Sequence, residues 1–96
     1  MQQYIITAYD FTDDGALERR LAVRPGHLAG AKKLKANGNF IIGGAMLNKE
    51  GKMIGSTMIL QFETTAEFED WQKNEPYLTQ KIWEKVEIQH FKVADV

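Results

Sequence analysis

The stretch FIIGGAMLNKEGKMIGSTMILQFE, residues 40–63, contains two apolar runs separated by a short polar segment. The first run, Phe40 to Leu47, has no polar position, which predicts a strand covered on both faces. Gly43-Gly44 within it indicates a bulge, or the close approach of a ligand or another backbone. Glu50-Gly51 falls between the runs and predicts a hairpin loop. Residues 40–63 are therefore expected to form two antiparallel strands in the middle of the chain.

The second run, Met53 to Glu63, can be divided into two faces because side chains alternate along a strand. One face carries Ser56 among the apolar side chains of Ile54, Met58, Leu60 and Phe62. The other carries Met53, Gly55, Thr57 and Ile59. Both faces are largely apolar, so we expect both to be covered.

A strand and a helical region precede the hairpin. Tyr4 to Asp10, YIITAYD, is rich in aromatic and β-branched residues and predicts a strand. In the helical region that follows, Pro25 lacks the backbone N–H that a helix interior uses. We therefore expect a first helical piece to end near Val23, and a second to start at Pro25 and run to Asn37-Gly38.

His27 falls in the first turn of this second piece. It is spaced to share a side with Ala31 and Leu34, at the edge of an apolar stripe that starts at Leu28. We expect a half-buried ring. The positive end of the helix dipole and partial burial both favour the neutral imidazole, which can accept a proton.

The C-terminal third predicts a helix, a turn and a strand. Thr64-Thr65-Ala66-Glu67 fits a capping box and begins a short helix that ends near Asn74. A loop or helical turn at Glu75-Pro76-Tyr77 leads to a last strand at about Trp83 to Val93. The apolar positions of that strand change parity, which indicates a bulge or a strand covered on both faces.

The resulting order of elements is β-α-β, hairpin, β-α-β, and the predicted fold class is therefore α+β. The specific fold expected is a ferredoxin-like βαββαβ sandwich with one antiparallel sheet. Residues 1–96 are expected to form it as a single domain. Two helices cover one face of such a sheet. Apolar groups on the other face then need a partner, and we expect a homodimer packed sheet to sheet.

The composition excludes several classes of protein. Twelve Lys and Arg balance thirteen Asp and Glu, giving a net charge of −1, which argues against a nucleic-acid or anionic-membrane partner. The chain has no cysteine, and therefore no disulfide, thiolate nucleophile or sulfur-ligated zinc. Two distant histidines make a metal site improbable, so we expect no metal and no cofactor. The start lacks a signal peptide and no run is long enough to span a membrane, which predicts a cytoplasmic protein.

The sequence resembles the YciI-like (YCII-related) family over nearly its whole length. The stretches that carry the resemblance are YIITAYD at 4–10, ALERRLAVRPGHL at 16–28, the glycine-rich strand at 40–47, Ile54-Gly55-Ser56, Pro76-Tyr77 and WEKVEI at 83–88. The resemblance implies a dimeric α+β barrel with a catalytic histidine and aspartate; one family member is a dechlorinase. The family usually has Asp before Pro-Tyr, where this chain has Glu75.

His27 and Glu75 are the candidate catalytic residues, since a histidine held by a carboxylate makes a general base near neutral pH. Arg20 and Arg24 would lie on the His27 side if the helix were continuous, and could then bind an acidic substrate. Alternatively, at least one of them forms a surface ion pair with a neighbouring acid such as Glu18. Ser56 could donate to a ligand or to a backbone partner, and Tyr77 could line a pocket or pack in the core. His27 and Glu75 could equally have structural roles: a residue of a capped helix turn and an exposed acid.

The leading hypothesis is a small enzyme of unassigned specificity that performs acid–base chemistry of isomerisation, elimination or dehalogenation type on a small polar or cyclic compound. The alternative is a non-catalytic dimeric module that binds a ligand or assists another protein. The substrate and the reaction are not specified by the sequence.

Overall fold

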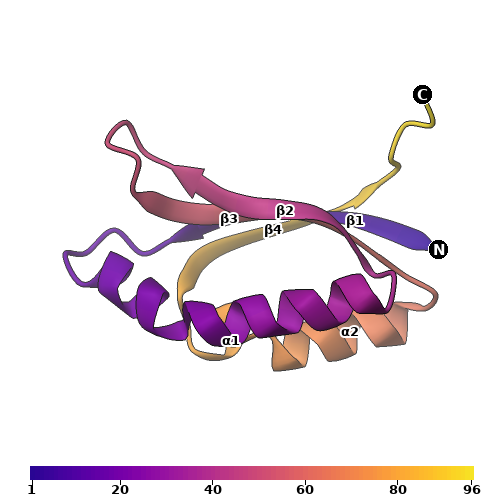
Figure 1. Cartoon of the computed structure of the whole chain (residues 1–96), viewed down its shortest axis with the longest axis horizontal. Helices are drawn as coiled ribbons and strands as arrows, with labels where there is room; N and C mark the ends of the chain where they lie inside the picture. Colours follow the sequence, from indigo (N-terminus) through magenta and orange to yellow (C-terminus); the bar gives the residue numbers. More distant parts are fainter.

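A computed structural model describes all of residues 1–96 as one sheet with its helices on one side (Figure 1). The elements, in order, are β1 (Gln2–Asp10), α1 (Ala16–Ala36), β2 (Phe40–Leu47), β3 (Met53–Phe62), α2 (Thr65–Asn74), α3 (Pro76–Thr79) and β4 (Trp83–Phe91). Every strand pair is antiparallel and the strand order is β2-β3-β1-β4. This is the predicted ferredoxin-like arrangement.

The core lies between the sheet and the helices. In β1, Tyr4, Ile6 and Ala8 point toward the helices and are buried, whereas the residues between them point away. The core comprises ten buried side chains: Tyr4, Ile6, Ala8, Met58, Leu60, Phe62, Phe68, Tyr77, Ile82 and Trp83. The strict period of two in β1 therefore decides which face of the sheet carries the helices.

Helix α1 runs unbroken through Pro25, so the prediction of two helical pieces is wrong. Proline at this position removes only the bond that would join its nitrogen to the Leu21 carbonyl. Both residues lie on the exposed side of α1, where water can hydrate the free carbonyl. A continuous helix also keeps Arg20, Val23 and His27 on one side, facing the sheet, and this packing outweighs the local cost of the proline.

The continuity of α1 changes the setting of His27. The residue lies in the middle of the helix instead of its first turn, so the helix dipole expected at that position does not act on it. The predicted shared side of His27, Ala31 and Leu34 is confirmed, since all three are partly buried. Leu28 differs from the prediction because it is exposed, and Val23 takes its place in the stripe.

The second half of the chain matches its prediction closely. The Thr64 side chain accepts a hydrogen bond from the Glu67 N–H at 3.2 Å, as expected of a capping box. Strand β4 ends at Phe91, two residues before the predicted end. Its pairing with β1 shifts register between Tyr9 and Asp10, so a bulge or irregularity lies between Trp83 and Lys85. The register is regular from Lys85 to Phe91, so this shift does not account for the change of parity near the end of the strand.

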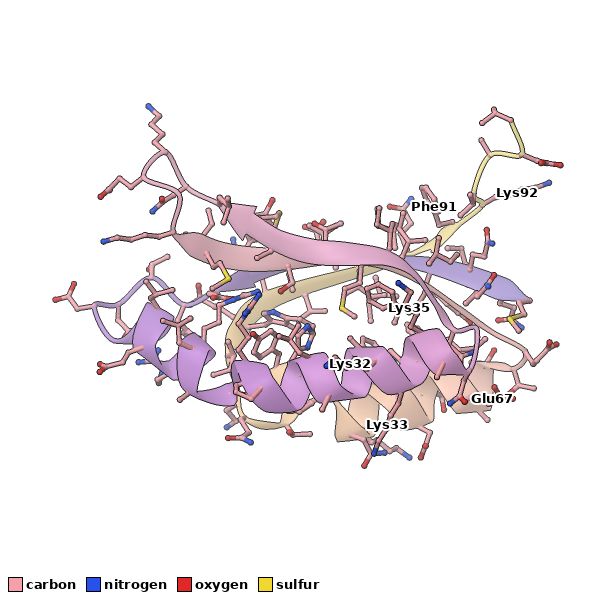
Figure 2. All side chains as sticks on the ribbon, viewed as in Figure 1. Lys32, Lys33, Lys35, Glu67, Phe91 and Lys92 are labelled. Carbon is pink, nitrogen blue, oxygen red and sulfur yellow. The ribbon has the colours of Figure 1, made fainter.

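The face of the sheet opposite the helices is uncovered in the single chain. The strand register aligns Ile42, Ile59 and Ile5 in one row across β2, β3 and β1 on this face. Ile42 is largely exposed, and Figure 2 shows Phe91 on the same side, away from the helices. A single chain therefore leaves one face of β2 uncovered, although both faces were predicted to be covered.

An exposed ion pair next to the start of α1 gives a pH-dependent prediction. The Arg19 guanidinium donates to both Asp13 oxygens at 2.7 Å, and these bonds lower the pKa of Asp13 from 3.8 to about 2. A folded-state pKa below the unfolded one means that the pair stabilises the fold above about pH 4 and loses this effect as the pH falls toward 2.

We therefore expect Asp13→Asn to lower the thermal unfolding midpoint slightly at neutral pH, with the difference from wild type closing at about pH 2. Circular dichroism melts at low ionic strength would measure it. A difference that stays constant across this range would show that Asp13 acts without its charge.

Candidate active site

Five elements bring the candidate site together under the sheet. Helix α1 supplies Arg20, Arg24 and His27, and the segment leading into α3 supplies Glu75 and Tyr77. Strands β1, β3 and β4 add Asp10, Ser56 and Trp83 respectively. Residues from both ends of the chain therefore meet on the helix side of the sheet.

His27 and Glu75 are in contact although 48 positions separate them in the sequence. His27 Nδ1 lies 2.5 Å from Glu75 Oε1, and their side chains are 12% and 2% exposed. A carboxylate only accepts hydrogen bonds, so Nδ1 is the donor, and in the neutral ring Nε2 then keeps its lone pair. The contact predicted from the sequence is present, and it leaves the imidazole with a free basic nitrogen.

Glu75 is itself fixed by the start of α3. Its Oε1 accepts the Tyr77 N–H at 3.1 Å, which caps this short helix. Pro76 occupies the first helical position, and Glu75 has the extended backbone that a residue before proline adopts. The longer side chain of Glu75, compared with the aspartate usual in the family, therefore still reaches the imidazole.

Two aromatic rings hold the imidazole in place. The Tyr77 ring stacks on it with centroids 4.0 Å apart and planes 14° apart. Trp83 meets it edge on at 6.3 Å and 77°. Because Tyr77 and Trp83 are buried, the imidazole has little freedom to rotate away from Glu75.

Arg20 stacks on the Tyr77 ring as well, with its guanidinium carbon 4.8 Å from the ring centroid. Arg20 and His27 are seven residues apart on α1, roughly 10.5 Å along the axis. The two stacking distances, 4.8 and 4.0 Å, fit a ring held between them. The Tyr77 ring therefore separates a permanent cation from the imidazole.

A buried ion pair anchors Arg20. Its Nη1 donates to both Asp10 oxygens at 2.9 and 3.1 Å, and both side chains are 3% exposed. Its Nη2 donates to Ser56 Oγ at 2.7 Å, and Trp83 Nε1 donates to the same oxygen at 3.3 Å. Burial raises the pKa of Asp10 above 3.8, although the Arg20 charge and hydrogen bonds oppose the shift.

Two buried polar atoms in the site have no hydrogen-bond partner: the Tyr77 hydroxyl and Arg20 Nε. Burial raises the pKa of the Tyr77 hydroxyl, although Arg20 and Arg24 oppose the shift, so the phenol stays protonated at neutral pH. Arg24 is partly exposed and forms no ion pair. A guanidinium that has no acidic partner is free to meet an anionic group.

Four of the five residues singled out from the sequence are connected through hydrogen bonds or ring stacking, and Arg24 is the fifth. His27, Glu75 and Tyr77 are in direct contact, and Ser56 joins them through Arg20 and Trp83 instead of a backbone partner. Arg24 lies on the same helix.

Asp10 and Trp83 were not identified as site residues from the sequence. Arg20 was considered only as part of a cationic clamp with Arg24, and the structure pairs it with Asp10 instead. One signal was available: Asp10 continues the alternation of Tyr4, Ile6 and Ala8 toward the helices, so an acid there must be buried and paired.

The fold and the buried histidine–glutamate pair define a small ferredoxin-like α+β protein with a candidate acid–base site. Residues 2–92 match the profile of the YCII-related domain family. The chain is 36% identical over 95 residues to Protein YciI of Escherichia coli O6:H1, covering 93% of this chain and 95% of that protein. An uncharacterized protein of Haemophilus influenzae matches at the same identity and coverage. The chain belongs to the YCII-related domain family.

Solved structures agree on the fold. The 5-chloro-2-hydroxyhydroquinone dehydrochlorinase (TftG) of Burkholderia phenoliruptrix AC1100, in complex with 2,5-dihydroxybenzoquinone, superposes with a TM-score of 0.79 at 24% identity, covering 96% of this chain and 95% of that one. A dimeric ferredoxin-like protein from an uncultured marine organism gives 0.56 at 14% identity, covering 99% and 90%.

None of the helices combines the length and the apolar character that crossing a bilayer requires. No three histidine, aspartate or glutamate side chains gather where they could hold a metal ion.

Proposed function

We propose that this chain is an acid–base enzyme in which His27 is the general base and Glu75 orients it. The observation that carries the proposal is the 2.5 Å contact between His27 Nδ1 and Glu75 Oε1, which leaves Nε2 as the basic nitrogen. Glu75 stabilises the imidazolium as a proton arrives at Nε2, and the stacked Tyr77 ring keeps the geometry. Proton removal by such a pair suits isomerisation, elimination or dehalogenation of a small polar or cyclic compound.

Arg24, Ser56 and Tyr77 complete the proposed site. The unpaired Arg24 guanidinium would hold an anionic oxygen of the substrate. The Ser56 oxygen accepts two hydrogen bonds, which leaves its own proton free to be donated. The Tyr77 hydroxyl is a neutral donor that has no partner within the chain. Three such donors would favour a substrate that becomes more negative during the reaction.

A non-catalytic module is the second candidate. The observation that favours it is the capping bond from the Tyr77 N–H to Glu75, since the same carboxylate could simply hold α3 against α1. In that case the His27 contact would support the fold and bind a ligand without turnover.

Turnover distinguishes the two candidates. Wild type and His27→Gln would each be incubated with 5-chloro-2-hydroxyhydroquinone, small unsaturated lactones and cyclic β-hydroxy acids. Turnover would be measured as a change in absorbance and, for the chlorinated compound, as release of chloride. The dehydrochlorinase similarity is the reason for the first compound. Turnover of at least one compound by wild type, lost in His27→Gln, is expected. No turnover across the panel, or equal turnover by both proteins, would favour the module.

We also propose that two copies pair through the uncovered face of the sheet. The row of Ile5, Ile59 and Ile42 supports this, as does the similarity to a dimeric ferredoxin-like protein. Sedimentation at micromolar concentration is expected to give twice the 10.9 kDa of one chain, and Ile59→Lys to give a monomer. Leu21→Lys, on the exposed side of α1, is the matched control and should remain dimeric. A wild-type monomer would contradict the proposal.

A further inference from the structure

A groove of about 700 Å³ lies between α1 and α2. On the α1 side its wall includes the small residues Gly26, Ala29 and Gly30. Their short side chains leave space next to the helix backbone. A Cβ placed on Gly30 would meet no atom within 4 Å, so the space beside it is open. The volume falls within the range of roughly 300–1,000 Å³ usual for small-molecule sites.

The floor of the groove is apolar and aromatic. Leu34, Phe62 and Trp71 line it, and Trp71 is only partly buried. The Trp71 indole stacks against Phe68 with centroids 5.9 Å apart and planes 10° apart, which fixes its orientation. A flat apolar body could therefore lie against this aromatic surface.

One end of the groove holds a buried carboxylate with a free oxygen. Glu75 lines the groove with its side chain only 2% exposed. Both of its hydrogen bonds, from His27 and from the Tyr77 N–H, fall on Oε1, and Oε2 accepts none from the protein. Asp70 lines the same groove. A carboxylate oxygen that receives no hydrogen bond from the protein favours a cationic ligand.

The charged residues of the groove lie at different places along its length, with Glu75 at one end and Lys33 toward the other. Gly26 lies beside Pro76, which marks the Glu75 end. Lys33 is seven residues further along α1, roughly 10.5 Å away, and the groove also includes Glu67. Figure 2 shows Lys33 and Glu67 on the helix side of the molecule, away from the sheet. The one lysine of the groove is therefore distant from Glu75.

We propose that this groove is a second ligand site, which takes a small organic cation with a flat apolar body. The ammonium group donates to Glu75 Oε2 near Asp70, and the apolar body lies on Trp71. The same carboxylate is hydrogen-bonded to His27, so a ligand in the groove changes the environment of the imidazole. Binding here does not depend on the proposed function, because it uses the groove side of Glu75 and requires no turnover.

Benzylamine is a suitable probe, and benzoate is the matched anion. In ¹H–¹⁵N NMR titrations of the full chain, benzylamine should shift the amide resonances of Gly26, Gly30 and Asp70 and the imidazole resonances of His27. These shifts should saturate as the benzylamine concentration rises. Benzoate should leave them unchanged. Gly30→Leu, which fills the open space, and Asp70→Asn should each weaken binding by about tenfold. Ala22→Leu, on the exposed side of α1, should bind as wild type does.

The proposal is overturned if benzylamine gives no saturable shifts, if benzoate shifts the same amides equally, or if Gly30→Leu and Ala22→Leu bind benzylamine equally well. It is also overturned if the amides shift while the His27 imidazole does not. Gly30→Leu places a good helix former at a position free of clashes, so it is expected to fold.

Discussion

Glu75→Gln is expected to lower kcat/KM by about 10²–10⁴-fold for any compound that the wild type turns over. Glutamine keeps an oxygen that can accept the Tyr77 N–H, so the cap of α3 survives. It carries no charge, and so it cannot stabilise the imidazolium that forms when Nε2 takes a proton. Activity should therefore fall far more than stability, which urea unfolding would measure on the same protein.

Glu75→Asp is the matched variant that keeps the charge and removes one methylene. We expect it to fall between wild type and Glu75→Gln, because the shorter side chain cannot keep both the 2.5 Å contact with His27 and the bond to the Tyr77 N–H. Equal activity in wild type and Glu75→Gln would contradict the role of the carboxylate in turnover.

Asp10→Ala is expected to destabilise the fold by about 3–5 kcal/mol, because it leaves the Arg20 guanidinium buried without its counter-charge. Arg20 would keep its bond to Ser56 and its stacking on Tyr77, and neither replaces a carboxylate. The loss should appear as a lower urea midpoint with little change in the slope of the transition.

The exposed pair of Arg19 and Asp13 is the matched control. This pair also uses both carboxylate oxygens, through two guanidinium nitrogens instead of one. Its side chains are 48% and 54% exposed, so Asp13→Ala should cost much less. The double variant Asp10→Ala with Arg20→Met should recover part of the lost stability, since it removes the unpaired charge. Similar losses for Asp10→Ala and Asp13→Ala would show that burial is not what makes the Asp10 pair important.

The fold could be predicted from local patterns because those patterns agree with the tertiary structure. The alternation of β1, the apolar runs on either side of Glu50-Gly51 and the cap at Thr64 each determine one element. Pro25 is the exception: its local preference favours a break, and the side of α1 that faces the sheet requires continuity. A rule about one residue could not weigh that packing.

The candidate site was only partly predictable for a related reason. His27 and Glu75 were identified by the family resemblance and by a loop position that lets them meet. Arg20 and Asp10 carry charges, which in a sequence usually indicate exposed residues, and their burial depends on contacts across 10 positions and two elements. The groove between α1 and α2 depends on the spacing of two helices, which no single segment encodes.

The pairing of His27 with Glu75 is the claim on which the functional account depends, and the imidazole nitrogens report it directly. Long-range ¹H–¹⁵N NMR of the neutral ring, assigned by comparison with His27→Gln, distinguishes a proton on Nδ1 from one on Nε2. The contact predicts the proton on Nδ1 and an unprotonated Nε2, with the pattern altered in Glu75→Gln. A proton on Nε2, or an identical pattern in wild type and Glu75→Gln, would contradict it.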